Sequence, residues 1–395
     1  MRSLALPLLT LCLASQTRAA PQLKPQRIRL AGGPAFSLYL PQGYRIVPAA
    51  QGLKRPRFFA LSPDNRIFVT EMHNKSDNSL GAITILEGFD SKLGQFSKIT
   101  RYLTGLRNPN SVAFWRDDKA KQTYLYVALT DKLLRYPYND GDSKPSGPPE
   151  TIATFPATGL SYKYGGWHLT RTIAVAPPSV APEGKIYVSV GSSGDALIEK
   201  EEVRATVLEM NPDGSQQKVW AKGLRNAVGL KWFGKTLYAT NQGSDHLGDN
   251  RPSETFYALR AGADYGWPYA YQSGGKIRRD PKFSRPQGIM GVPLADAAFP
   301  AHSSALGFEW FGAETQDSVL RNRFMVALHG SGFTRLKRGY SLVTVQKGRA
   351  CEPFLTGFLC GRRIYGRPCD ILKQSDGSFF FSDDFKGVIY YVTRK

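Results

Sequence analysis

The sequence repeats one type of short strand six times. Segments rich in aromatic and β-branched residues recur along the whole chain, namely NRIFVTEM, TYLYVALT, GKIYVSVG, KTLYATNQ, NRFMVALHG and GSFFFSDD. One aromatic residue from each segment gives steps of 58, 61, 51, 86 and 56 residues between Phe68, Tyr126, Tyr187, Tyr238, Phe324 and Phe380. Repetition at this period indicates six structural units of similar size, one of which carries an insertion.

Each unit contains further strands. An apolar segment such as SVAFW, RTIAVAP, VGLKWF or ALGFEWF precedes the repeated strand, and in several units a third strand follows, such as LLRYPY, VLEMNPDG or GVIYYVT. Almost no segment has the i, i+3, i+4, i+7 apolar spacing of an amphipathic helix. The sequence therefore predicts an all-β fold, a six-bladed β-propeller of four-stranded antiparallel blades. An array of β-sandwiches is the alternative, but it does not account for the regular spacing of the units.

The predicted propeller covers residues 35–395. We expect FSLYLPQGYRIV, at residues 36–47, to complete the last blade and tie the two termini together. Residues 20–34 form an N-terminal extension. Residues 1–19 combine an early Arg2, an apolar run too short to cross a bilayer, and small residues at the end, which is the pattern of a secretory signal peptide. We therefore expect a secreted or periplasmic protein without a transmembrane segment.

Three cysteines, Cys351, Cys360 and Cys369, follow the predicted signal peptide. An oxidising compartment favours disulfides, so we predict one bond, with Cys351 to Cys360 as the simplest pairing. Cys369 is then expected to be a buried free thiol. The cysteines form no paired CxxC motif, which argues against a zinc site.

The formal net charge is +20, from 52 Lys and Arg against 32 Asp and Glu. Such an excess suits nucleic acid, an anionic surface or an anionic ligand, or serves solubility in an acidic habitat. The basic residues are scattered and no DNA- or RNA-binding motif is present, so nucleic acid is not predicted as a partner.

Polar residues occur where a propeller binds its ligands, at the loops that lead into and out of the inner strands. His168, in YGGWHLTRTIAV, opens one blade, and Arg225 and Asn226, in GLRNAVGL, open the next. Arg367 opens the last blade in YGRPCDI, and Arg335 follows FMVALHGSGF. Each of these residues alone is more typical of a solvated surface or a structural clamp. Their shared position predicts that they face one mouth of the channel.

The loop after KTLYAT is dense in oxygen ligands of the kind that calcium takes. They are Asn241, Gln242, Gly243, Ser244, Asp245, Asp249, Asn250 and Glu254. The same residue types dominate capped turns, so spacing alone leaves a metal site and a long turn as alternatives.

Taken together and in this order, the motifs resemble those of the pyrroloquinoline quinone (PQQ)-dependent soluble sugar dehydrogenases. This family includes soluble glucose and aldose sugar dehydrogenases, sorbosone dehydrogenases and fungal pyranose dehydrogenases. The resemblance runs from about residue 41 to the C-terminus, and its further motifs are GKIYVSVGSSGD, TNQGSDHLGDN, ADYGWPY, FPAHSSALGFEWF and GRPCDILKQSDGSFFFSDDFKGVIYYV. Single motifs are weak signals, but the ordered set is specific.

The resemblance implies oxidation of a sugar, or of a sugar-derived aldehyde or alcohol, by hydride transfer to PQQ, with electrons passed to an external acceptor. His168 would be the general base, and Arg225 would polarise the quinone carbonyl with Asn226 beside it. Gln242 would touch the quinone. Arg335 and Arg367 would meet the carboxylates of PQQ, which suit guanidinium groups.

The resemblance also implies calcium. The main-chain carbonyls of Gly243 and Ser244 would hold the ion that PQQ also ligates, and such a dication makes the quinone more electrophilic. A second, structural calcium would lie at Glu254 and the carbonyl of Tyr265.

Three positions depart from the family. Ser192 stands where some glucose-oxidising members have an acid that orients the base, and the nearest carboxylate is Asp195, which we include among the catalytic residues. Val228 replaces a polar residue, and Ser244 replaces a frequent proline. These differences leave the sugar and the electron acceptor open, and the segment at residues 272–300 is the expected substrate lid.

Two other functions remain as alternatives. A calcium-dependent six-bladed lactonase or esterase needs acidic ligands that converge from several blades, which the sequence does not provide near the channel. A non-catalytic sugar-binding propeller predicts that PQQ leaves the stability of the protein unchanged.

Overall fold

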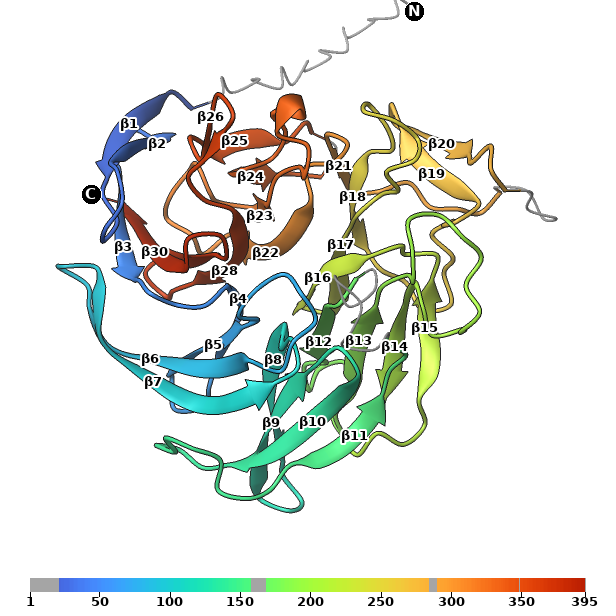
Figure 1. The fold of residues 1–395 in the computed structure, drawn as a ribbon. Helices are drawn as coiled ribbons and strands as arrows, with labels where there is room; N and C mark the ends of the chain where they lie inside the picture. Colours follow the sequence, from blue (N-terminus) through green and yellow to red (C-terminus); the bar gives the residue numbers. More distant parts are fainter. Residues whose placement is uncertain (1–20, 158–167, 284–289, 348, 395) are drawn as a thin grey trace, which may run out of the picture.

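Six antiparallel sheets of four strands surround a central axis in the computed structural model, which describes residues 21–157, 168–283, 290–347 and 349–394 (Figure 1). The predicted signal peptide lies outside these residues. The predicted all-β, six-bladed propeller is confirmed. Within the described residues the one helical element is the short 3-10 turn η1 (Thr334–Leu336), and no helix there is long and apolar enough to cross a membrane.

The first three blades follow one order, from the inner strand outward. They are β4 (Pro56–Leu61), β5 (Ile67–Glu71), β6 (Gly81–Asp90) and β7 (Gln95–Leu106); β8 (Ser111–Asp117), β9 (Gln122–Ala128), β10 (Lys132–Tyr138) and β11 (Glu150–Thr154); and β12 (Arg171–Val175), β13 (Ile186–Val190), β14 (Thr206–Met210) and β15 (Lys218–Lys222). Adjacent strands in sequence therefore pair as simple hairpins.

The last three blades contain the insertion and the closure of the ring. They are β16 (Ala227–Phe233), β17 (Thr236–Asn241), β18 (Glu254–Ala258) and β21 (Ala297–Phe299); β22 (Ala305–Phe311), β23 (Arg323–Leu328), β24 (Ser341–Val345) and β25 (Glu352–Leu355); and β28 (Pro368–Lys373), β29 (Phe379–Asp383), β30 (Val388–Arg394) and β3 (Tyr44–Ala50). The long 86-residue step includes the hairpin of β19 (Ala270–Ser273) and β20 (Lys276–Arg279), which precedes β21. Another hairpin joins β26 (Leu359–Cys360) and β27 (Arg363–Ile364).

The repeated aromatic residues lie in the second strand of every blade. Phe68 in β5, for example, is fully buried and meets Phe114 of the next blade edge-on, with ring centroids 5.0 Å apart. Tyr126 in β9 donates its hydroxyl proton to the carbonyl of Pro212 in the third blade, at 2.7 Å. The repeated aromatic residues from which the fold was predicted are therefore residues that pack one blade against the next.

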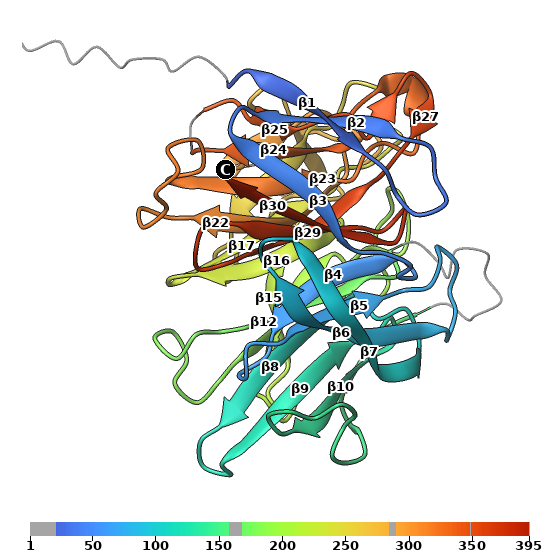
Figure 2. The ribbon, with the colours of Figure 1, turned by 90° about the vertical axis from the view of Figure 1, so that its left-hand side faces the viewer.

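The N-terminal segment closes the ring, but only in part as predicted. Strand β3 pairs with β30 and completes the last blade. The first half of residues 36–47 does not join this blade, because Gly43, at φ 89°, reverses the chain after β2 (Phe36–Pro41). Strand β2 pairs instead with β1 (Leu23–Ile28), and this hairpin lies along the outer edge of the fifth blade (Figure 2).

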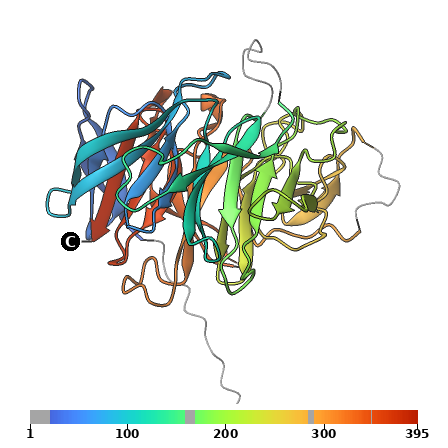
Figure 3. The same ribbon diagram turned by 90° about the horizontal axis from the view of Figure 1, so that it is seen from below.

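The channel is filled at its centre. Phe58, Val228, Leu306 and Cys369, from four different inner strands, form one buried apolar cluster. The strands run between the two faces of the ring (Figure 3), and the inner strands β4, β8, β12, β16, β22 and β28 neighbour one another around the axis. The ends of these strands therefore form a mouth above a packed core.

The predicted disulfide between Cys351 and Cys360 is wrong, because both residues are free thiols. Cys351 packs against the core between the fourth and fifth blades, whereas Cys360 is exposed in β26. The extended strand β25 lies between them and carries the chain away, at about 3.3 Å per residue. Cys369 is fully buried and free, as predicted.

Candidate functional site

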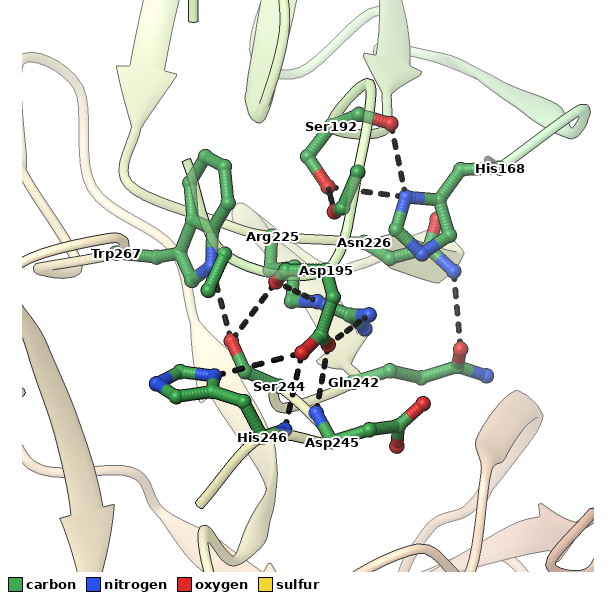
Figure 4. A network of polar contacts seen from close by, with 12 residues as sticks. His168, Ser192, Asp195, Arg225, Asn226, Gln242, Ser244, Asp245, His246 and Trp267 are labelled. Carbon is green, nitrogen blue, oxygen red and sulfur yellow. Dashed lines mark hydrogen bonds and ion pairs between the residues drawn. The ribbon is translucent and has the colours of Figure 1, made fainter. Parts of the chain in front are cut away.

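His168 lies three residues before β12, at the start of an inner strand, and has a left-handed backbone with φ 56°. Its Nδ1 lies 2.9 Å from the carbonyl oxygen of Ser192 and 3.0 Å from the hydroxyl oxygen (Figure 4). A carbonyl can only accept, so Nδ1 carries the proton and Nε2 is the unprotonated nitrogen. Burial, followed by the Arg225 guanidinium, lowers the pKa of His168 well below its usual 6.5. The ring is therefore neutral near pH 7, as a base must be.

Two residues that the sequence analysis missed shape the surroundings of His168. Arg171 is fully buried, and its guanidinium donates to the carbonyls of His168 at 2.8 Å and Thr170 at 2.9 Å. Gly191 is needed next to the ring, because a Cβ there would lie 2.6 Å from the Cβ of His168. The sequence signal for Arg171 was a charged residue at the start of the apolar strand RTIAV.

Arg225, two residues before β16, is buried and held by Asp195. Its Nε donates to the Asp195 carbonyl at 2.8 Å, and Nη2 pairs with Oδ1 of the same residue at 2.9 Å. The backbone amides of Asp245 and His246 also donate to this carboxylate, at 2.6 Å and 2.9 Å. Burial raises the pKa of Asp195, but these amides and Arg225 outweigh it and lower the pKa overall.

The contacts of Asp195 define its role. The carboxylate meets Arg225 and the loop after β17, and its carbonyl accepts a hydrogen bond from Ser244 Oγ at 3.0 Å (Figure 4). It therefore orients Arg225 and the loop, whereas the main chain of Ser192 orients His168. The family resemblance made Asp195 the nearest candidate for an acid that orients the general base. In the structure, Asp195 contacts Arg225 instead of His168.

Asn226 and Gln242 join the same group. Asn226 Nδ2 donates to Gln242 Oε1 at 2.9 Å. The backbone N–H of Gln242 donates to the backbone carbonyl of Asn226 at 3.1 Å. The structure thus brings His168, Arg225, Asn226, Gln242 and Asp195 together at one mouth.

The predicted calcium loop borders a small cavity of about 30 Å³. Gly243, Ser244, Tyr265 and Trp267 are among its lining residues, and Trp267 Nε1 donates to Ser244 Oγ at 3.1 Å. Gly243 is packed against the ring of Pro252, which a Cβ would meet at 2.2 Å. A space of this size accommodates one water or one ion.

Glu254 is buried beside this loop and fits a cation. Its Oε2 has no hydrogen-bond partner among the described residues, and burial raises its pKa to about 8. A bound cation would satisfy this oxygen and keep the carboxylate ionised. Within the described part of the chain no three His, Cys, Asp or Glu side chains converge on one metal position, so main-chain carbonyls would have to supply the remaining ligands.

The other two predicted arginines lie elsewhere. Arg335 is exposed in η1 and pairs with Asp249, Nη2 to Oδ1, at 2.7 Å. Arg367 is buried, and its guanidinium donates to the carbonyls of Gly330 at 2.6 Å and Ser331 at 3.1 Å. Neither makes a contact with the His168 group in the described residues, so their roles toward a cofactor stay predictions.

A second polar group, at the start of β4, was missed. Arg55 and Arg57 both pair with Asp384, at 2.8 Å and 2.7 Å, and His329 Nε2 lies 2.8 Å from the other carboxylate oxygen. The signal was present, since the segment KRPRFF, with three basic residues, opens the first blade as GLRNAV opens the fourth.

This group shares a mouth with His168. Arg57 Nε donates to Asn110 Oδ1 at 3.0 Å, and Asn110 Nδ2 donates to Thr172 Oγ1 at 3.0 Å. The Thr172 hydroxyl in turn donates to the carbonyl of Val228. A belt of hydrogen bonds therefore joins the first four inner strands near their beginnings.

The buried His329 is expected to make the folded protein less stable at acidic pH. Burial lowers its pKa from 6.5 to about 4 despite Asp384, so between these values the unfolded chain binds a proton that the folded protein does not. The unfolding free energy should fall as pH drops from 6.5 to 4, by roughly 3 kcal/mol for this group. Urea unfolding at pH 7 and pH 4 should show a larger loss for the parent than for His329→Gln. Equal losses would contradict this assignment.

Comparison with known proteins extends these observations. No protein-family model matches the chain. A protein of Borreliella burgdorferi described as uncharacterized is 29% identical over 220 residues, which cover 53% of this chain and 57% of that protein. The match thus spans little more than half the length of this relative.

Solved structures share the fold over nearly the whole chain. The holo PQQ domain of pyranose dehydrogenase from Coprinopsis cinerea has a TM-score of 0.71 and 17% identity, covering 91% of this chain and 98% of that one. PQQ-bound aldose sugar dehydrogenase from Streptomyces coelicolor has a TM-score of 0.59 and 19% identity, with coverage of 90% and 100%. A calcium structure of a family AA12 enzyme from Trichoderma reesei has a TM-score of 0.70 and 15% identity, with coverage of 95% and 98%. The chain therefore has the propeller fold of PQQ-containing sugar dehydrogenases.

Proposed function

We propose that this protein is a quinoprotein oxidoreductase that oxidises a sugar, or a sugar-derived aldehyde or alcohol, with PQQ as cofactor. One observation carries the proposal, namely a neutral His168 whose Nε2 is the basic nitrogen, at the same mouth as the buried Arg225. The neighbouring solved structures that contain PQQ support it. Electrons would pass to an external acceptor.

PQQ, when bound, supplies an electrophilic quinone that accepts hydride. In this chain, His168 Nε2 would take the proton of the substrate hydroxyl. The Ser192 carbonyl would then stabilise the imidazolium through Nδ1–H. Arg225 would stabilise negative charge on an oxygen at the mouth, held in place by Asp195, with Asn226 and Gln242 as further polar contacts.

Calcium would be held at the loop after β17. Carbonyls of Gly243 and Ser244 are the proposed ligands of one ion, and Glu254 with the Tyr265 carbonyl those of a second. The unpartnered Oε2 of Glu254 supports the second site most directly.

The remaining assignments rest on the sequence. Export to the periplasm or the medium depends on residues 1–19, and we retain residues 20–34 as an extension and 35–395 as the catalytic propeller. Contact of Arg335 and Arg367 with cofactor carboxylates, and a lid role for the segment around β19 and β20, are part of the same proposal.

Binding measurements test the cofactors separately from activity. Calcium or PQQ at 100 times its dissociation constant should raise the unfolding free energy by about 2.7 kcal/mol. Glu254→Gln should remove the part of the calcium increment that the second site contributes, because it loses the charge that this ion would meet, whereas the exposed Glu314→Gln should leave the increment unchanged. Unfolding curves recorded with chelator, calcium and PQQ give these values. A chelated protein that gains nothing from calcium would exclude the metal sites.

A further inference from the structure

Four cations gather where the first and last blades meet at the channel mouth. Arg55 and Arg57 lie at the start of β4, and Arg367 directly precedes β28, the neighbouring inner strand. Lys75, on the loop after β5, is close enough for Arg55 and Arg367 to act on its charge. The three arginines are buried or nearly so, and Lys75 reaches the group from an exposed loop.

Carboxylates compensate little of this charge. Asp384 pairs with Arg55 and Arg57 through one oxygen, while its other oxygen meets His329, which is neutral because its pKa is lowered to about 4. Asp383 is engaged elsewhere, since its Oδ1 accepts the backbone amides of Arg367 and Phe385, and burial raises its pKa to about 7. Among the described residues, Asp384 is thus the carboxylate that forms ion pairs with these cations.

Burial and the neighbouring cations act in the same direction on two members of this group. Lys75 is an exposed residue, but partial burial of its ammonium group, then Arg55 and Arg367, lower its pKa. Burial lowers the pKa of Arg55, and Arg57 adds to this while Asp384 opposes it. Positive charge buried without counterions is unfavourable, and a bound anion would relieve it.

Two donors in this group are also unsatisfied. Arg55 Nε and Arg367 Nε are buried and have no hydrogen-bond partner among the described residues. Arg55 moreover has a left-handed backbone, with φ 60°, which is uncommon for a residue other than glycine and is often found at functional sites. Arg57, in contrast, donates from Nε to Asn110 and from Nη1 to Asp384.

We propose that Arg55, Arg367 and Lys75 form an anion-binding subsite at the channel mouth and that it takes a carboxylate. The carboxylate comes from PQQ or from an acidic sugar, and the first of these sources rests on the proposed function. Arg55 directly precedes β4, so it lies at the same end of the inner strands as His168 and Arg225, which precede β12 and β16, and Lys75 lies on the loop after the neighbouring strand β5.

Equilibrium titrations of the full chain test the subsite. The probes are PQQ, citrate as a tricarboxylate without a quinone, galacturonate, and galactose as the uncharged control. Arg55→Met should weaken binding of the carboxylate probe by about tenfold or more, the effect of losing a charge-assisted hydrogen bond. Lys75→Met should weaken it less, because this side chain is more exposed. Arg135→Met, which removes a cation paired with Glu150 far out in the second blade, should change nothing.

The outcomes separate the sources. Loss of PQQ and citrate affinity in Arg55→Met assigns the subsite to the cofactor, and loss confined to galacturonate assigns it to an acidic substrate. If PQQ fails to bind the parent while citrate binds and depends on Arg55, the proposed function fails and the subsite stands. Carboxylate affinities equal to the parent's in both Arg55→Met and Lys75→Met would overturn it.

Thermal unfolding of the ligand-free variants provides a second readout. Removing a poorly compensated cation should leave the melting temperature of Arg55→Met at or above that of the parent. A lower melting temperature combined with unchanged carboxylate affinity would identify Arg55 as a structural clamp of Asp384, and the proposal would be wrong.

Discussion

Replacement of His168 by glutamine is expected to lower substrate-driven reduction of PQQ by about 10²- to 10⁴-fold, the usual contribution of a general base. Glutamine keeps a polar side chain of similar reach but cannot take up the hydroxyl proton. Binding of PQQ and calcium should stay nearly intact, since no metal contact is assigned to this ring. Single-turnover kinetics with the reconstituted protein measure the effect.

The pH profile adds a specific check on the same residue. Because the pKa of His168 lies well below 6.5, the base stays neutral as pH falls through the range in which an ordinary histidine becomes protonated. The parent should therefore keep its activity through that range. His73→Gln, on the loop after β5, is the matched control and should behave like the parent. A His168→Gln variant that binds PQQ normally and reduces it at the parental rate would make the catalytic assignment wrong.

Arg225→Met should lower turnover by about 10²- to 10³-fold, because in the proposed mechanism it removes a buried guanidinium that would stabilise developing negative charge. Arg225→Lys should not restore it, since an ammonium group cannot reproduce the two bonds that Nε and Nη2 make to Asp195. Steady-state kinetics, with PQQ saturation verified, measure both variants.

Asp195→Asn tests whether Asp195 acts through Arg225. It should have a smaller effect, and combined with Arg225→Met it should add almost nothing, because the two residues form one unit. Additive effects would mean that Asp195 works independently of the arginine. Parental turnover in Arg225→Met would contradict the role of Arg225 itself.

The fold could be predicted because each blade repeats the same packing problem. Phe68 and its five counterparts fill the space between neighbouring sheets, so their spacing reports the number of blades directly. The termini were harder to predict. Strands β2 and β3 have similar composition, and only the turn at Gly43 decides that β3 joins the last blade while β2 pairs with β1.

The site could be predicted in outline for a related reason. Residues that lie within a few positions before an inner strand, such as His168 and Arg225, must lie at the mouth once the fold is a propeller. The direction in which each side chain points, and the groups to which it hydrogen-bonds, cannot be predicted from its position in the sequence. Arg367 precedes an inner strand too, yet most of its donors are occupied by the carbonyls of Gly330 and Ser331. Arg55 also lies directly before an inner strand, β4, but the sequence analysis did not identify it.

Most of the other features that the sequence did not predict are contacts between segments far apart in the chain. Nothing local indicates that the Ser192 carbonyl would fix the tautomer of His168, or that Asp195 would reach the amides of Asp245 and His246 across a blade boundary. The disulfide prediction failed similarly, because sequence proximity of Cys351 and Cys360 does not reveal the extended strand β25 between them.

Reconstitution tests the central claim most directly. The purified protein, freed of metal by chelation, should be inactive in reducing an artificial electron-acceptor dye with any aldose, sugar aldehyde or sugar alcohol. Addition of PQQ together with calcium should restore dye reduction with at least one member of this panel, and either addition alone should not. A protein that binds neither PQQ nor calcium and reduces no dye with any member of the panel would contradict the assignment as a quinoprotein sugar dehydrogenase.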